Sequence, residues 1–412
     1  MLKIAVLGYG VVGSGTVEVL EKNADKITCN AGRELRVHYI LDVRDFPDSP
    51  HKHLFAQSFE PIVSDPDVAV VVEAIGGTGA ALDYTRRSLA AGKSVVTSNK
   101  ELVAMHGCEL LKLAGENGVN YLFEASVGGG IPVIRPVSQC MSANNIGEIY
   151  GILNGTTNYI LSEMLKSGAD FADALSDAQK KGYAEADPAA DIEGHDACRK
   201  ICILASLAFG RHIYPAQVPA EGITGVTLDD MCFASGLGYK IKLLGRVRAV
   251  GDKVAAYVAP HLVSNDNLLA VCNGVMNGVV VRGNAVGDVF LCGPGAGKLP
   301  TASAVVADVI DAVKHMQVRK LIGWGEGGQD LAVDPMLLES AWYIRTNARR
   351  EKIEREFGNV IFAASADSAY QADDGPDSIV AFKTAVMSGL KIQELLSRGI
   401  DALSLFRILG DY

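Results

Sequence analysis

The chain has 412 residues, which at roughly 150 residues per domain predicts two or three domains with a core that needs no disulfide or metal. Hydrophobic residues make up 49% and charged residues 21%, a composition that argues against a disordered chain. Acidic residues outnumber basic ones by 48 to 38, and the resulting charge of −10 argues against a protein that binds the backbone of nucleic acids.

The eight cysteines form no CxxC pair and no zinc-finger spacing. The first residues, MLKIAVLGYG, follow a strand pattern and not that of a signal peptide. No apolar run reaches the length of a membrane span. We therefore expect a reduced, cytoplasmic setting away from membranes.

In the first third of the chain, strand patterns alternate with helix patterns. Strands are predicted at 3–7, 35–41, 68–74, 94–97 and 120–123, and helices at 11–21, 80–91 and 105–118. This alternation predicts an α/β fold with a doubly wound parallel sheet.

The middle of the chain reads as an α+β domain. Helices are predicted at 158–167, 172–182, 197–210 and 228–237, and strands at 146–153, 241–250, 253–262 and 279–283. A Gly-rich turn at 292–298 leads into a helix at 301–314. From about Pro335 a small α+β module is predicted, with strands at 341–346, 378–384 and 402–408, helices at 350–357 and 387–398, and a loop at 371–377.

The first motif is the GxGxxG turn formed by Gly8, Gly10 and Gly13, with Val11 and Val12 between the last two glycines. It follows a strand and opens a helix, which is the context of a dinucleotide-binding turn. The helix N-terminus would supply N–H groups to a pyrophosphate. At the end of the second strand, Asp42 favours NAD and Arg44 favours NADP, and of the two cofactors we expect NADP.

Polar residues and glycines follow the carboxyl ends of the later strands, where an open α/β sheet forms its ligand crevice. Gly76 lies after the third strand, and Ser98 and Lys100 lie after the fourth. A lysine there could polarise a carbonyl group, or it could be a surface residue at a helix start. The Gly-rich segment from Glu124 to Pro132 could hold a cation through oxygen ligands, although a hinge between domains is the alternative.

The most informative stretch runs from residue 178 to residue 200, AQKKGYAEADPAADIEGHDACRK. Asp196 and Lys200 are four residues apart, so they share one face of a helix that continues into an apolar, buried run. Carboxylates such as Glu185 and Asp196 could bind an ammonium group, and Lys200 could exchange a proton with a hydroxyl or carbonyl group. An ion pair that only satisfies itself is the alternative.

This stretch resembles the signature of the homoserine dehydrogenase family. The fixed positions of that signature are met by Ala178, Gly182, Tyr183, Ala184, Asp187, Pro188, Asp191, Ile192, Gly194, Asp196 and Lys200. The segments GYGVVG, SNKELVA, EASVGGGIP, NGTTNYIL and GPGAG extend the resemblance over roughly residues 1–325.

The resemblance implies NAD(P)-dependent interconversion of L-homoserine and L-aspartate 4-semialdehyde, on the way to threonine and methionine. It implies catalytic roles for Lys200 and Lys100. Substrate-binding roles are implied for Glu185, Asp196, Asp191, Gly155, Thr156 and Tyr183, and cofactor contacts, besides those of the glycine turn and Arg44, for Gly76, Ser98, Lys100, Gly182, Glu185 and Gly297. It also implies a sodium site formed by Glu124, Val127, Gly129 and Ile131, and a homodimer or higher homo-oligomer.

The expected domains are therefore an NAD(P)-binding Rossmann-type domain at 1–130, onto which a helix at 301–325 packs back, a substrate-binding and dimerisation domain at 131–300, and a C-terminal module at 335–412. The module loosely resembles an ACT regulatory domain of βαββαβ form, and threonine inhibition is one possibility. Rival readings are a non-catalytic dinucleotide sensor, a dehydrogenase of another small amino or hydroxy acid, and an aldehyde dehydrogenase that would need a reactive cysteine such as Cys108.

Overall fold

The computed structural model describes residues 1–364 and 379–410, so the loop expected at 371–377 lies outside the described residues. The chain divides into two compact units, which are interleaved along the sequence. Unit 1 consists of Met1–Ile146, Cys202–Pro215 and Arg282–Gly328, and unit 2 of Gly147–Ile201, Ala216–Val281 and Gln329–Tyr412.

Unit 1 contains a parallel sheet with helices on both faces. Its elements are β1 (Leu2–Leu7), α1 (Val11–Lys22), α2 (Ala24–Ala31), β2 (Leu35–Leu41), α3 (Glu60–Ser64), β3 (Val68–Glu73), α4 (Ala80–Ala90), β4 (Ser94–Thr97), α5 (Lys100–Glu116), β5 (Tyr121–Leu122), β10 (Gly287–Pro294) and α11 (Lys298–Lys314). The strand order β2-β1-β3-β4-β5, with every neighbouring pair parallel, confirms the predicted doubly wound sheet. The order reverses between β1 and β3, and this is the edge at which such sheets bind ligands.

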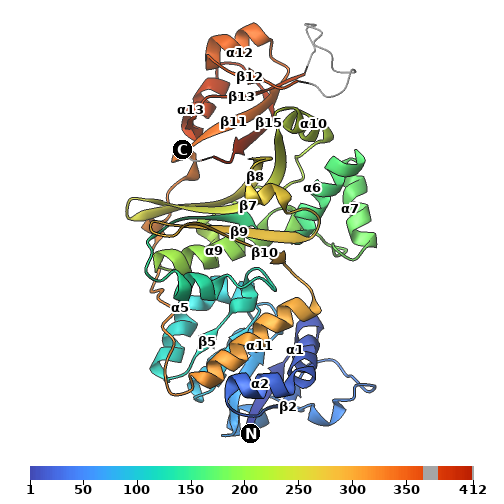
Figure 1. Cartoon of the computed structure of the whole chain (residues 1–412), viewed down its shortest axis with the longest axis vertical. Helices are drawn as coiled ribbons and strands as arrows, with labels where there is room; N and C mark the ends of the chain where they lie inside the picture. The colour runs from blue at the N-terminus through green and yellow to red at the C-terminus, as the bar shows by residue number, and fades with distance from the viewer. Residues whose placement is uncertain (365–378, 411–412) are drawn as a thin grey trace. The chain divides into compact units, whose positions relative to one another are not determined.

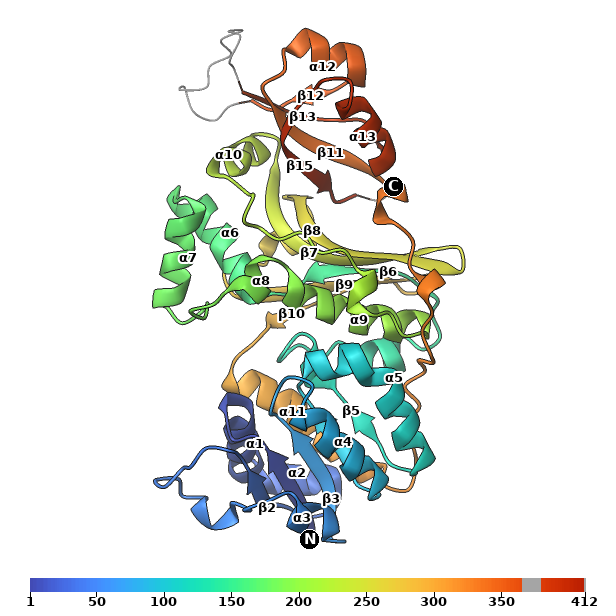
Figure 2. The same ribbon diagram turned by 180° about the vertical axis from the view of Figure 1, so that it is seen from behind.

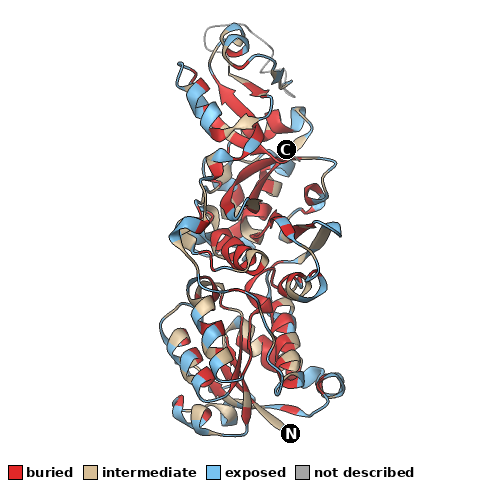
Figure 3. Ribbon diagram, turned by 90° about the vertical axis from the view of Figure 1, so that its left-hand side faces the viewer, coloured by how far each residue is buried: buried red, intermediate tan, exposed pale blue. Residues whose placement is uncertain are grey.

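The core of unit 1 follows from the spacing of its apolar residues. Ile4 and Val6 of β1, and Val70 and Val72 of β3, point to one face of the sheet and are fully buried there. Helices α1, α2 and α11 cover that face (Figure 1), and α4 and α5 lie on the opposite face (Figure 2). Figure 3 shows buried residues along the strands and exposed residues on the outer sides of the helices.

Unit 2 is built on a second, mixed sheet. Its elements are β6 (Ile146–Ile152), α6 (Gly155–Ser167), α7 (Phe171–Lys180), α8 (Ala189–Ile192), α9 (His195–Phe209, whose second half belongs to unit 1), α10 (Leu228–Gly236), β7 (Tyr239–Val250), β8 (Lys253–Ser264) and β9 (Met276–Gly283). The strand order β9-β6-β7-β8 continues through β15 (Ala402–Ile408), β11 (Glu339–Thr346), β13 (Val380–Lys383) and β12 (Ile361–Phe362), and β14 (Met387–Ser388) pairs with β11.

The C-terminal segment therefore shares a sheet with the rest of unit 2. Its described elements are β11, α12 (Arg350–Phe357), β12, β13, the two-residue strand β14, α13 (Gly389–Leu396) and β15, so without β14 they follow the order βαββαβ. Strand β15 pairs with β8 in parallel, at Arg407 opposite His261 and Ile408 opposite Leu262. The buried residues between the strands and the two helices include Trp342, Ile353, Phe357, Phe382 and Ile392. The relation of this module to ACT domains stays a prediction.

Among the described residues, no helix has the length and apolar character that crossing a bilayer requires.

Candidate active site

The glycine turn between β1 and α1 has the geometry of a phosphate cradle. Gly8 has a φ of +90°, and a Cβ atom at this position would lie 2.5 Å from the carbonyl oxygen of Ala74. A Cβ atom at Gly13 would lie 1.8 Å from the carbonyl oxygen of Gly8. Gly10 is the N-cap residue of α1 and offers no side chain to the N–H groups of the first turn. These groups can therefore bind an anion, and the residues fit a dinucleotide pyrophosphate.

Asp42 lies just after β2 and is held by two neighbours. Its carboxylate accepts hydrogen bonds from the backbone N–H of Tyr9 at 2.6 Å and from the guanidinium group of Arg44 at 2.9 and 3.0 Å. The Arg44 side chain lowers the pKa of the Asp42 carboxyl to about 2. A Cβ atom on Gly10 would lie 3.5 Å from this guanidinium group, so Arg44 lies beside the glycine turn.

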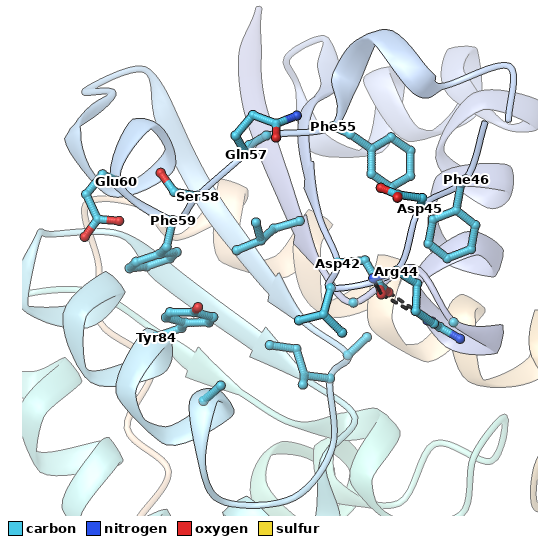
Figure 4. A pocket seen from close by; sticks show the side chains of 18 of the residues that line it. Asp42, Arg44, Asp45, Phe46, Phe55, Gln57, Ser58, Phe59, Glu60 and Tyr84 are labelled. Atoms are coloured by element: carbon cyan, nitrogen blue, oxygen red, sulfur yellow. Dashed lines mark hydrogen bonds and ion pairs between the residues drawn. The ribbon is translucent and has the colours of Figure 1, made fainter.

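A cleft of about 1330 Å³ opens at this end of unit 1. It is lined by Gly8, Gly10, the segment 41–47, Lys52, the segment 55–60, Ala74, Ile75, Ala80, Asp83, Tyr84 and Arg87. Figure 4 shows two pairs of aromatic rings on opposite sides, Phe46 with Phe55 and Phe59 with Tyr84, and both pairs are stacked. The flat aromatic walls suit an adenine ring. The charged lining is mixed, with three cationic side chains (Arg44, Lys52, Arg87) and four acidic ones (Asp42, Asp45, Glu60, Asp83).

The ends of β3 and β4 are tied together by a buried carboxylate. Glu73 accepts hydrogen bonds from the backbone N–H groups of Ile75 and Gly76 and from the Thr97 hydroxyl, at 2.8, 3.2 and 2.6 Å. Burial raises the pKa of this carboxyl. Asn99 donates to the carbonyl oxygen of Gly77 and caps α5 through the N–H of Leu102.

This network determines where the predicted residues of the crevice lie. Gly76 is exposed with a φ of +89°, and Ser98 is partly buried. Lys100 is the first residue of α5, which begins five residues earlier than expected. All of these residues belong to unit 1.

The segment predicted to hold sodium begins with the short turn η2 (Glu124–Ser126), also in unit 1. The Glu124 carboxylate is buried and accepts three backbone N–H groups, from Val133, Ile134 and Arg135, at 2.6 to 2.8 Å. These bonds occupy most of its acceptor positions, so cation binding in this segment would depend on backbone carbonyl oxygens. Gly129 has a positive φ and packs against Gly295 of the turn at 293–297.

That turn ends at Gly297, the N-cap residue of α11. Helix α11 packs closely against α1. A Cβ atom on Gly15 would lie only 2.8 Å from the carbonyl oxygen of Lys298, so this close approach requires a glycine. The ion pair between Lys298 and Glu18, at 2.7 Å, joins the same two helices. Gly297 is thus carried on the helix that packs beside the glycine turn of the same unit.

Unit 2 brings a lysine, two aspartates and an asparagine together. Lys200 of α9 donates to the Asp196 carboxylate at 2.6 Å and to the carbonyl oxygen of Leu153 at 2.8 Å. Asn154 donates to Asp196 at 2.8 Å and to Asp191 of α8 at 2.7 Å. Lys200 is 9% exposed and Asp196 is 3% exposed. A buried lysine held by a carboxylate and a carbonyl group can donate a proton in a fixed direction.

The other residues predicted to bind substrate in unit 2 lie around the start of α6. The Thr156 hydroxyl donates to the carbonyl oxygen of Tyr183 at 2.6 Å, and the Tyr183 ring packs against Tyr159. Gly155 is the first residue of α6, and a Cβ atom there would lie 2.9 Å from the carbonyl oxygen of Val275. Gly182 and Glu185 lie on the exposed loop that precedes α8.

The structure thus gathers Asp191, Asp196 and Lys200, and separately joins Thr156 to Tyr183, all within unit 2. Lys100 and the glycine turn belong to unit 1. The sequence patterns described above predict no role for Asn154, Glu73 or Asn99. Two of them are asparagines directly before a helix, and that position is a recognisable cap signal.

Two family models match this chain. The model described as homoserine dehydrogenase matches residues 132–310, and the model described as homoserine dehydrogenase, NAD binding domain, matches residues 8–124. Curated relatives carry the same name. The relative from Pseudomonas aeruginosa is 43% identical over 357 residues, which cover 84% of this chain and 82% of that protein. The relative from Mycobacterium bovis is 37% identical and covers 97% and 93%.

Solved structures agree with the relatives. A homoserine dehydrogenase from Thiobacillus denitrificans superposes with a TM-score of 0.88 at 36% identity and covers 99% of this chain and 98% of that one. A hyperthermophilic archaeal homoserine dehydrogenase in complex with NADPH has a TM-score of 0.65 at 30% identity, covering 76% and 97%.

Proposed function

The chain belongs to the homoserine dehydrogenase family, and on that premise we propose specific roles for the residues of its two units. The activity of the family is the NAD(P)-dependent interconversion of L-homoserine and L-aspartate 4-semialdehyde. The chain is accordingly an oxidoreductase of amino-acid biosynthesis.

In the proposed mechanism, Lys200 is the acid/base residue. A bound nicotinamide dinucleotide supplies the hydride, or takes it up in the reverse direction. Lys200 Nζ gives a proton to the carbonyl oxygen as the carbonyl carbon is reduced, and it accepts the hydroxyl proton when homoserine is oxidised. The observation that carries this role is the pair of hydrogen bonds that hold Lys200 Nζ at Asp196 and at the carbonyl oxygen of Leu153.

We assign the remaining residues to binding and orienting the substrate and the cofactor. Glu185, Asp191 and Asp196 hold the substrate through its ammonium and hydroxyl groups, and Gly155, Thr156 and Tyr183 line the amino-acid pocket. Lys100, the second catalytic residue, stabilises the developing alkoxide or the edge of the cofactor. The glycine turn at 8–13 holds the pyrophosphate, and Gly76, Ser98, Gly182 and Gly297 complete the cofactor contacts.

The experiment is the formation of reduced cofactor from L-homoserine, measured with NAD and NADP side by side, for the native chain and for Lys200→Ala. We expect homoserine-dependent reduction in the native chain and a loss of at least about a hundredfold in the variant. A loss below about tenfold, or roughly 1.4 kcal/mol of barrier, would contradict the acid/base role.

NADP is the proposed cofactor. The Asp42 carboxylate is already engaged by Arg44 and Tyr9, so it is poorly placed to accept hydrogen bonds from ribose hydroxyls. Arg44 is exposed beside the glycine turn, where its guanidinium group could pair with a 2′-phosphate. A higher kcat/KM for NADP than for NAD would support this assignment.

A sodium site is proposed at Glu124, Val127, Gly129 and Ile131. Support comes from the oxygen-only donor set and from the positive φ angles of Gly128 and Gly129, which turn the backbone sharply. Because the carboxylate of Glu124 accepts three N–H groups, Glu124 would contribute its carbonyl oxygen, which accepts the N–H of Val127 at a longer 3.5 Å.

We also propose a homodimer or higher homo-oligomer in a reducing cytoplasm, on the basis of the family resemblance and the cysteine spacing. Sedimentation analysis would test the oligomer. For the C-terminal module we propose an ACT-like role in assembly, and equilibrium binding of threonine would test whether it also binds an effector.

The rival reading as an aldehyde dehydrogenase requires a reactive cysteine, and Cys108 is the candidate. Burial raises the pKa of the Cys108 thiol, whereas a catalytic cysteine needs a lowered pKa.

A further inference from the structure

Asn154 connects β6 to α6 and is buried, with 5% of its surface exposed. All the hydrogen-bonding capacity of its amide group is used. The oxygen Oδ1 accepts from the backbone N–H and the hydroxyl of Thr157, at 2.8 and 3.0 Å, and the nitrogen Nδ2 donates to Asp191 and Asp196. A flipped amide would set its oxygen against two carboxylates and its N–H groups against an N–H donor, so the orientation is determined by the neighbours.

The two carboxylates belong to different elements. Asp191 lies on α8 and Asp196 lies on the first turn of α9, with Gly194 at a φ of +84° between them. Both approach the same nitrogen atom of Asn154. Asp196 is buried and Asp191 is partly buried, so their negative charges repel each other, and the Asn154 amide places donors between them without adding a charge.

The same short segment also holds the lysine. Lys200 donates to the carbonyl oxygen of Leu153, the residue directly before Asn154, and to the same Asp196 oxygen that accepts from Asn154. The segment 153–154 therefore contacts both members of the Asp196–Lys200 pair. The backbone carbonyl of Leu153 binds Lys200, and the side chain of Asn154 binds Asp196.

Helix capping favours asparagine at this position, as Asn99 shows at the start of α5, but capping alone does not require it. A cap needs only an acceptor for an N–H of the first turn, and Asp170, Thr227 and Ser388 supply one at the starts of α7, α10 and α13. What asparagine adds at position 154 is a pair of N–H donors directed at the two aspartates.

We propose that Asn154 is a positioning residue for the dehydrogenase reaction. It holds Asp191 and Asp196 at a common distance from one amide nitrogen, and through Asp196 it sets the direction in which Lys200 presents its proton. This role rests on the proposed function, in which Lys200 is the acid/base residue and the aspartates bind substrate.

Two variants separate positioning from capping. Asn154→Ser keeps a cap acceptor and loses the amide donors. Asn154→Asp keeps an acceptor oxygen for both donors of Thr157, has nearly the same shape, and sets a third carboxylate against Asp191 and Asp196. The control is Asp170→Ala, which removes the cap of α7, where the Asp170 carboxylate accepts the backbone N–H of Asp173. The measurements are kcat, the KM values for L-homoserine and for the dinucleotide, and the thermal midpoint.

For Asn154→Ser we expect kcat/KM for homoserine to fall about thirtyfold or more, with the KM of the dinucleotide within about twofold of the native value. Asn154→Asp should lose more activity than the serine variant, although its cap is the better preserved. Asp170→Ala should lower the thermal midpoint and leave both KM values unchanged.

The proposal is overturned if either folded Asn154 variant keeps homoserine activity within about threefold of the native chain. It is also overturned if the loss of activity in the variants only matches the loss of folded protein, with both KM values unchanged. A residue that only caps α6 would give that result. If the native chain itself showed no homoserine-dependent reduction, the proposed function would fail instead, so the two failures are distinguishable.

Discussion

The guanidinium group of Arg44 donates two hydrogen bonds to the Asp42 carboxylate, from Nε to Oδ1 at 3.0 Å and from Nη2 to Oδ2 at 2.9 Å. The same carboxylate also accepts the backbone N–H of Tyr9. An acidic residue at the end of the second strand often binds ribose hydroxyls, but here its oxygens are engaged by the neighbouring arginine. Arg44 remains exposed at the mouth of the cleft.

Arg44→Ala should therefore change the choice of cofactor. We expect the KM for NADP to rise roughly tenfold or more, because a charge partner for the 2′-phosphate is lost. The KM for NAD should stay equal or fall, since Asp42 is released. Initial rates with both cofactors measure this. Arg36→Ala, on β2 and paired with Glu34, is the control. Equal effects on NAD and NADP would contradict the assignment.

Asp196→Asn should lower kcat by about a hundredfold, because the ammonium group of Lys200 loses its charged partner. Asparagine has nearly the same shape, but it leaves the buried ammonium group of Lys200 without a charged partner, so the thermal midpoint should also fall and kcat is compared per folded protein. The matched control is Glu394→Gln, which neutralises an exposed carboxylate four residues from Arg398. Steady-state rates at saturating homoserine decide the outcome, and a variant that kept native kcat would show that the ion pair is only structural.

His261 should make unit 2 sensitive to acid. Its ring is buried, with one nitrogen at the carbonyl oxygen of Ala259 and the other at the Tyr257 hydroxyl, and burial, together with the charge of Arg246, lowers its pKa to about 3. The unfolded chain, with an ordinary histidine pKa of 6.5, binds the proton more readily. The stabilisation is therefore complete above pH 6.5 and is lost as the pH falls towards 3.

Between neutral pH and pH 5, this single group should cost the native chain about 2 kcal/mol of unfolding free energy. His261→Gln should lose that part of the pH dependence, whereas His38→Gln, at an exposed histidine, should keep it. Urea midpoints at the two pH values provide the comparison. If the urea midpoints of the native chain and of His261→Gln fell by the same amount between the two pH values, His261 would not be the cause of the acid sensitivity.

Asp230 of α10 anchors the C-terminal module. Its fully buried carboxylate accepts from Arg345 and Tyr343 of β11 and from Ser404 of β15. Asp230→Ala would leave Arg345 buried with its main partner removed, and we expect a loss of about 3 to 5 kcal/mol of stability. Asp229→Ala, at the neighbouring and more exposed position, should cost much less. Thermal midpoints measure the difference, and similar values for both variants would contradict the anchoring role.

Much of the fold follows from local pattern. Alternating or continuous apolar runs predicted β2, β4 and β15 with the bounds that the structure gives, because a buried strand requires such a run. The sequence patterns do not predict the helices α2 and α3 or the strand β10. Their apolar runs are short, and these elements are stabilised by packing against their neighbours. The GxGxxG turn was also readable, because its glycines meet a local steric demand at Gly8 and Gly13.

The sequence by itself determined the doubly wound sheet and the family and proposed the residues of the candidate site, because periodicity and motif spacing are local properties. Only the tertiary structure decided that Asp42 is engaged by Arg44, that the Glu124 carboxylate is occupied by N–H groups, and that Asn154 lies between Asp191 and Asp196. These are contacts between segments that sequence spacing does not relate, and packing alone settles which donor meets which acceptor.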